Sequence, residues 1–173
     1  MLTVINAGHH PGSDPGSVGS SITEAELAKE YAYLVIKYLE AADESAIFVQ
    51  DELEEVCDIA NEKNADLFVS IHFNAFDNKA HGTETLYCED SKNGKILASC
   101  IHNQLIDTLK LTNRGLKIDT LYVTAHTNMP SCLVEVGFLD NLEEEKILIE
   151  KKDDACRAIA RGITDAINII FNQ

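Results

Sequence analysis

The strongest constraint on the fold is the segment 67–71, Leu-Phe-Val-Ser-Ile, which is almost continuously apolar. A strand with apolar side chains on both of its faces has to be covered on both faces, which is typical of the central strands of parallel sheets. Parallel strands are joined by long crossover connections that usually contain a helix. This segment therefore predicts an α/β protein with helices packed against a sheet.

The rest of the chain alternates apolar runs with helical patterns, as that architecture requires. Further strands are expected at residues 2–7, 46–49, 83–88, 121–123 and 131–136. Helices are expected at residues 22–42, 52–63, 96–109, 142–150 and 155–171. The predicted fold is a single α/β domain whose central, mixed but mostly parallel twisted sheet has about five to six strands flanked by about five helices.

Size and charge exclude several functions. The 173 residues, 45% hydrophobic and 25% charged, suffice for one sizeable core, and the net charge of −15 argues against binding nucleic acid or anionic membranes. No run approaches the roughly 20 apolar residues of a membrane span, so no membrane insertion is expected. The N-terminus has no signal-peptide pattern. We expect either cytoplasmic synthesis with release by lysis or a longer native chain that carries an export signal.

The cysteines are scattered singly, are odd in number and show no Cys-x-x-Cys spacing. Neither a disulfide framework nor a structural thiolate zinc site is therefore expected. Most of them are interpreted as small buried apolar side chains in a reducing compartment. They are Cys57, Cys88, Cys100, Cys132 and Cys156.

Three apolar segments end in, or contain, a group that can bind a metal or move a proton. His9 follows the first strand, His72 follows the segment 67–71, and Glu135 lies within the last predicted strand. Taken alone, each histidine could be structural, and Glu24 could be an ordinary charge at the start of a helix. Glu135 is harder to explain in this way, because a carboxylate inside a buried strand is costly unless it is paired, coordinated or functional.

Strand ends gather along one edge of an α/β sheet, so residues far apart in sequence can converge there. With Glu24 added, the candidate set is two histidines and two carboxylates. Two histidines and one carboxylate with an open fourth position are a familiar ligand set of catalytic zinc, and a further carboxylate nearby can carry a proton. The residues thus point to metal-assisted hydrolysis.

Four sequence blocks then resemble the signature blocks of the zinc-dependent N-acetylmuramoyl-L-alanine amidases, the group found in bacterial autolysins, sporulation hydrolases and phage endolysins. The blocks are residues 6–16 with His9, Glu24 after a short polar loop, residues 70–75 with His72, and residues 129–141 with Glu135. Residues 59–61 and 113–117 are similar to intervening segments of that family. The resemblance covers nearly the whole chain, with the blocks in the family's order.

The resemblance implies a single catalytic amidase domain over residues 1–173, with one zinc ion per chain held by His9, Glu24 and His72. It implies that Glu135 is the catalytic carboxylate, and that the substrate is peptidoglycan, cut between the lactyl group of N-acetylmuramic acid and L-alanine. His10 is interpreted as a neighbour, because the family places the ligand directly after the glycine. The protein would act at the bacterial cell wall and is expected to be a monomer.

The chain departs from the family pattern at two places that could touch substrate. Many relatives have an arginine where this chain has residues 56–58, Val-Cys-Asp, and another where it has Ala125 and His126. Two alternatives stay open from the sequence: a different zinc hydrolase of wall peptides, such as a carboxypeptidase or deacetylase, and a wall-binding module without catalysis. The sequence does not distinguish a phage endolysin from an autolysin or a sporulation enzyme.

Overall fold

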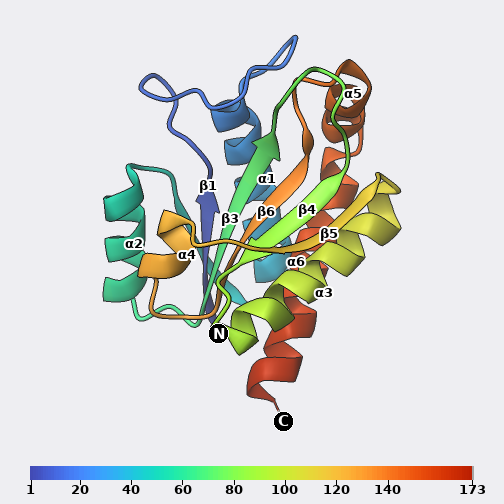
Figure 1. Ribbon diagram of the computed structural model, residues 1–173. Coiled ribbons are helices and arrows are strands. Elements are labelled where there is room, and N and C mark those ends of the chain that lie inside the picture. The colour runs from blue at the N-terminus through green and yellow to red at the C-terminus, as the bar shows by residue number, and fades with distance from the viewer. Residues whose placement is uncertain (173) are drawn as a thin grey trace.

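Six strands form one sheet in the order β2-β1-β3-β6-β4-β5 in the computed structural model, which describes residues 1–172 (Figure 1). The pairs β1–β2, β1–β3, β3–β6 and β4–β5 are parallel, and only β4–β6 is antiparallel. The predicted mixed, mostly parallel sheet is confirmed. The strands are β1 (Leu2–Ala7), β2 (Ser45–Val49), β3 (Leu67–Asn74), β4 (Thr83–Tyr87), β5 (Asn113–Ile118) and β6 (Ser131–Phe138).

Helices cover both faces of the sheet. In Figure 1, α1, α3 and α6 lie behind the sheet, and α2 and α4 lie in front of it. The shorter α5 lies near the edge where β1 and β3 end. The helices are α1 (Glu24–Glu40), α2 (Leu53–Glu62), α3 (Lys92–Leu109), α4 (Tyr122–His126), α5 (Leu142–Glu150) and α6 (Lys152–Phe171).

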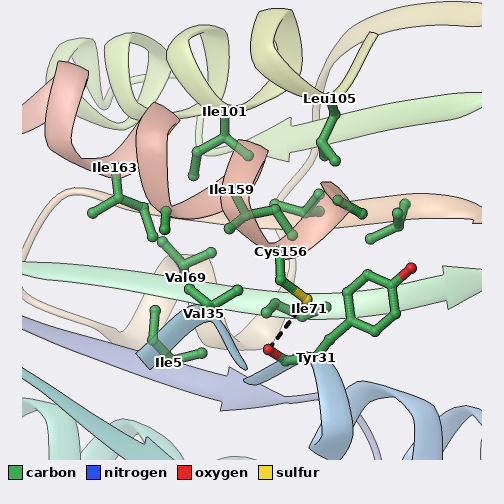
Figure 2. Close-up of a cluster of buried hydrophobic side chains, with 14 of the residues drawn as sticks. Ile5, Tyr31, Val35, Val69, Ile71, Ile101, Leu105, Cys156, Ile159 and Ile163 are labelled. Carbon is green, nitrogen blue, oxygen red and sulfur yellow. Dashed lines mark hydrogen bonds between the residues drawn. The ribbon is translucent and has the colours of Figure 1, made fainter. Parts of the chain in front are cut away.

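The larger core cluster fills the space between the sheet and α1, α3 and α6 (Figure 2). Each fully buried aliphatic side chain there stabilises the fold by about 2 kcal/mol relative to exposure. Inside the cluster the Cys156 thiol donates a hydrogen bond to the Tyr31 carbonyl at 3.6 Å. Figure 2 labels Ile5, Val69 and Ile71 from the strands with Val35, Ile101, Ile159 and Ile163 from the helices.

The alternation of side chains along β3 decides which residues face the second helix layer. Val69 and Ile71 belong to the larger cluster, whereas Phe68 belongs to the smaller cluster under α2 and α4. Because the side-chain period of a strand is two, His72 shares the face of Phe68. Glu135 is the register partner of His72 on β6 and lies on that same face with Leu133.

Two details of the predicted elements were wrong. Residues 121–123 do not form a strand, because α4 begins at Tyr122 and is tied to α2 by Asn61, whose side-chain amide donates to the His126 carbonyl and accepts from the Asn128 amide. The strand β5 was missed. It lies at the edge of the sheet and has mostly exposed or half-buried polar residues, so it lacks the apolar alternation that identifies a strand.

The described residues contain no helix that is long and apolar enough to cross a membrane. All five cysteines are unpaired, and Cys57, Cys132 and Cys156 are buried.

Candidate metal and catalytic site

His9 lies in the loop after β1, where the backbone conformation restricts which residue types fit. Gly8 donates its N–H to the Ile71 carbonyl, which keeps the loop against β3. A Cβ at Gly8 would lie 2.4–2.6 Å from ring atoms of His72, so glycine is needed at this close approach. His9 itself has a φ of 58°, in the left-handed region that few non-glycine residues adopt. Backbone conformations of this kind cluster at functional sites, although Asp43, Asn64, Asn78 and Lys110 adopt positive φ elsewhere in this chain.

The same loop folds back over the two candidate ligands at Gly16. This glycine has a φ of +66°, and a Cβ there would lie 2.5 Å from the His9 ring and 2.6 Å from Glu24 Oε2. Asp14 fixes the His9 ring, since its Oδ2 lies 2.8 Å from His9 Nδ1 while its Oδ1 accepts the Gly16 N–H at 3.1 Å. His9 Nε2 is thereby directed towards Glu24, at 3.3 Å from Oε2.

Glu24 is the first residue of α1, directly after the capping residue Thr23. Its side chain is buried, and both oxygens are fully engaged. Oε1 accepts the Phe73 N–H at 2.9 Å and lies 3.0 Å from His72 Nδ1, while Oε2 accepts the Ser17 N–H at 2.8 Å. The carboxylate therefore joins the β1 loop, α1 and β3 at one point.

The two imidazoles control the charge of this carboxylate. Burial alone would raise the pKa of Glu24, but the hydrogen bonds with His72 and His9 hold it far below its usual range. In turn, the hydrogen bond with Glu24, working against burial and assisted by Asp14, raises the pKa of His9 to about 9. Glu24 is thus held as an ionised carboxylate between the two imidazoles. A metal ion that binds here would displace the protons from the coordinating histidine nitrogen atoms.

The donor set fits a metal ion. One ligand atom from each of His9, Glu24 and His72 lies within 4.8 Å of the others. Two neutral imidazoles and one carboxylate are typical ligands of zinc at catalytic sites. Gly8 and Gly16 pack directly against the three candidate ligands, and a larger residue at either position would collide with them. This close packing supports a site formed by the three side chains.

Glu135 lies beside this cluster in a contrasting environment. It is half-buried, and its Oε2 is buried with no hydrogen-bond partner within residues 1–172. Burial, together with repulsion from Glu24 and Glu84, raises the pKa of Glu135 to about 8, although His9 lowers it in part. A buried carboxyl group with an unused oxygen, facing a set of metal-type ligands, is a candidate for proton transfer.

The structure adds residues that the sequence reasoning did not select. Glu84 on β4 is the cross-strand register partner of Glu135. Its oxygens accept hydrogen bonds from Asn74 Nδ2 and Arg114 Nε, both at 2.9 Å. A charged residue inside the buried pattern of residues 83–88 was the available signal for Glu84. Nothing local in the sequence pairs Asp14 with His9.

The two other histidines noted in the sequence do not join the cluster. His10 points its Nδ1 to Ser13 Oγ at 3.1 Å, and its backbone bridges to Asp14. His126 stacks on Tyr122 within α4, with ring centroids 4.1 Å apart.

Fold and site together define a class: an α/β protein in which two imidazoles and a carboxylate meet where parallel strands end, with a second carboxyl group beside them. The sequence profile described as N-acetylmuramoyl-L-alanine amidase matches residues 3–168 of the chain. The chain belongs to this family.

Individual relatives agree over nearly the whole chain. An uncharacterized cell wall amidase of Bacillus anthracis is 34% identical over 94% of the chain, and N-acetylmuramoyl-L-alanine amidase LytC of Bacillus subtilis is 33% identical over 88%. The alignments span only 35% and 33% of those two relatives. The solved structure of N-acetylmuramoyl-L-alanine amidase AmiC2 of Nostoc punctiforme has a TM-score of 0.90 at 32% identity, with 97% of each chain covered.

Proposed function

We propose that this chain hydrolyses the amide bond between the lactyl group of N-acetylmuramic acid and L-alanine in bacterial peptidoglycan, and that it does so with one zinc ion. The observation that carries the proposal is the position of Glu135, a buried carboxyl group with an unpartnered oxygen in register with His72. Family membership and the names of the relatives support the choice of bond.

The ligands in this proposal are His9, Glu24 and His72. Asp14 would accept a hydrogen bond from His9 Nδ1–H and so keep Nε2 free of a proton for the ion, since a carboxylate behind a ligating histidine fixes its tautomer. When bound, zinc supplies a Lewis acid that polarises an amide carbonyl and makes water more acidic.

Glu135 performs the proton transfers. The ionised carboxylate accepts a proton from the attacking water, and the same proton is delivered to the alanine nitrogen as the C–N bond breaks. The products are the lactyl carboxylate and a stem peptide with a free amino group. A carboxyl group whose pKa is raised to near neutral is suited to both steps, because near neutral pH it can both accept a proton and donate it.

The test is to digest purified peptidoglycan with the zinc-loaded protein and to identify the new end groups by mass spectrometry. Stem peptides with a free N-terminal L-alanine are expected. Free D-alanine or acetate would instead identify a carboxypeptidase or a deacetylase. Sedimentation of the protein with peptidoglycan without any new end group would favour a wall-binding module.

The place of action follows from the substrate. We propose that the protein acts at the cell wall, with peptidoglycan as its partner and without nucleic acid. The net charge of −15 supports the last point, because polyanions would be repelled.

A further inference from the structure

Two cavities of different charge adjoin the candidate site, one next to Glu84, the register partner of Glu135, and the other at His9 and His72. One, of about 600 Å³, is lined by the end of β3, the loop between β3 and β4, residues around the start of β5 and the end of β6. It contains Lys79 and Arg114 with the single carboxylate Asp77. The chain has only 14 lysines and arginines against 29 acidic residues, so a cavity with more cations than carboxylates is unusual for this protein.

The other cavity, of about 150 Å³, lies over the β1 loop and the start of α2. Its lining includes the candidate ligands His9 and His72. The carboxylates of the lining are Asp14, Asp51 and Glu52, and there is no lysine or arginine among the lining residues. The lysine and arginine of the first cavity would attract an anionic part of a ligand, whereas the second cavity offers only carboxylates beside the candidate metal ligands.

Glu84 links the cationic cavity to the strand that carries Glu135. Asn74 and Arg114, which line the cavity, both hydrogen-bond to Glu84 at 2.9 Å, and Glu84 is the register partner of Glu135. The guanidinium of Arg114 is already engaged by Glu84 and lies 5.0 Å from the ring centre of Phe138. The cavity thus begins one strand away from Glu135.

Lys79 is the cation that a ligand can recruit. It is exposed, and its ammonium group makes no hydrogen bond or ion pair within residues 1–172. The backbone around it is fixed, because the N–H groups of Lys79 and Ala80 donate to Asp77 at 3.0 and 2.8 Å. Beside it, Phe76 is 83% exposed and offers an apolar wall.

We infer that the cationic cavity binds the stem peptide of the substrate and that the glycan strand lies towards the acidic cavity. The inference rests on the proposed function and adds the direction of the substrate across the site. The stem peptide follows L-alanine with D-glutamate, whose α-carboxylate projects from the chain, and contains alanine methyl groups. Lys79 binds that carboxylate and Phe76 contacts the methyl groups, whereas the sugars next to the bond carry no charge.

The experiment compares two soluble substrates that differ in one charge: N-acetylmuramoyl-L-alanyl-D-glutamyl-L-lysine and its counterpart in which the α-carboxylate is an amide. Binding of both is measured by calorimetry on the zinc-loaded Glu135→Gln protein, and cleavage is measured on the wild type. We expect the acid to bind roughly tenfold more tightly than the amide, as for a charge-assisted hydrogen bond. Lys79→Glu should remove or reverse this preference.

The control is Lys95→Glu, which makes the same charge change on an exposed residue of α3, the helix on the far face of the sheet. It should leave the preference intact, because exposed charges farther apart than about 10 Å are largely screened. Equal binding of acid and amide, or a preference that survives Lys79→Glu, overturns the inference even if both substrates are cleaved. Failure of the wild type to cleave either substrate overturns the proposed function, while a charge-dependent binding preference would still support the cavity's assignment.

Discussion

The pKa values of Glu24, which is buried, and Glu135, which is half-buried, are shifted in opposite directions by their surroundings. Glu24 is surrounded by two imidazoles and two backbone N–H groups, which keep it ionised. Burial of the Glu135 carboxyl group, together with repulsion from Glu24 and Glu84, raises its pKa and favours the protonated form. Opposite pKa shifts in neighbouring groups are how a single site assigns different roles to one residue type. Here they separate a candidate ligand from a candidate proton carrier.

The first prediction separates these roles. Glu135→Gln should retain one zinc per chain but lose about 10²–10⁴-fold of its peptidoglycan hydrolysis, because proton transfer is removed while the ligands are intact. His72→Ala should lose both zinc and hydrolysis. Zinc is measured by elemental analysis of the purified protein, and hydrolysis by the turbidity of a cell-wall suspension. A fully active Glu135→Gln protein would refute the assignment.

The second prediction concerns pH. The raised pKa of Glu135 means that the folded state binds its proton more tightly than the unfolded state between pH 4.5 and about 8. The metal-free wild type should therefore lose stability as pH rises through this window, by up to about 1.4 kcal/mol per pH unit from this group. Glu135→Gln should lack that component, because its amide does not titrate.

The measurement is urea unfolding of both proteins at pH 5, 6.5 and 8 with a chelator present. The raised pKa of His9 also makes the protein lose stability as pH rises, over a higher pH range. This contribution is common to both proteins and cancels in the comparison. Parallel stability curves for the two proteins would contradict the burial described for Glu135.

The helices α3 and α6 pack closely against each other at Gly162. A Cβ on Gly162 of α6 would lie 2.4 Å from the Cα of Ile101 on α3, so the two backbones approach closely there. The small residue lets α6 sit low enough to bury Ile159 and Ile163 against the sheet. A glycine in mid-helix normally weakens the helix, and here the close packing compensates.

The third prediction tests that packing. Gly162→Ala should destabilise the protein by about 2 kcal/mol, because the added methyl group meets backbone atoms that cannot rotate away. Chemical denaturation measures the change. Helix propensity alone would give the opposite sign, a gain of about 1 kcal/mol, so a stabilised variant would disprove the close approach.

The matched control is Arg161→Ala on the exposed side of the same helix. Its guanidinium pairs with Asp165 at 3.0 Å, but a solvent-exposed pair of this kind contributes little. A change below about 0.5 kcal/mol is expected.

The elements with strong periodicity were predictable, and those held by tertiary contacts were not. The central strand β3 and the long helices α1 and α6 follow directly from their apolar patterns. By contrast, α3 begins at Lys92, before the predicted residue 96, because Ser91 caps its first turn. The edge strand β5 is polar because it has one neighbour and little to bury.

The candidate site shows the same division. His9, His72 and Glu135 were predictable because each interrupts or follows a buried strand. The partners Asp14 and Glu84 were not, because their importance depends on loop closure and on strand order, which no local pattern encodes.

At the scale of the whole molecule, the candidate ligands come from three parts of the chain that are brought together only by folding: the loop after β1, the start of α1, and β3. A metal that binds this arrangement and not the unfolded chain stabilises the fold by mass action. A bound metal would thus connect the carboxyl ends of β1 and β3 with the start of α1 through three side chains.

The fourth prediction follows from that linkage. Removing zinc with a chelator should lower Tm by about 10 °C, given about 4 kcal/mol of binding at a thousandfold excess over Kd and roughly 2–4 °C per kcal/mol for a chain of this size. Readdition of zinc should restore it. Differential scanning calorimetry measures the shift. His72→Ala should show no zinc-dependent shift, and an unchanged wild-type Tm would argue against a bound metal.

Glu24 belongs at once to the candidate metal site and to the first turn of α1. The amide groups of that turn carry the partial positive charge of the helix, which would repel a cation if the carboxylate did not stand between them. Without a cation the first turn is closed by the Thr23–Glu26 capping box, and a cation bound by Glu24 would add a further constraint on this turn. Deuterium uptake by the amides of residues 24–27 should therefore report the fraction of molecules that are loaded, without a substrate and without a label on the metal.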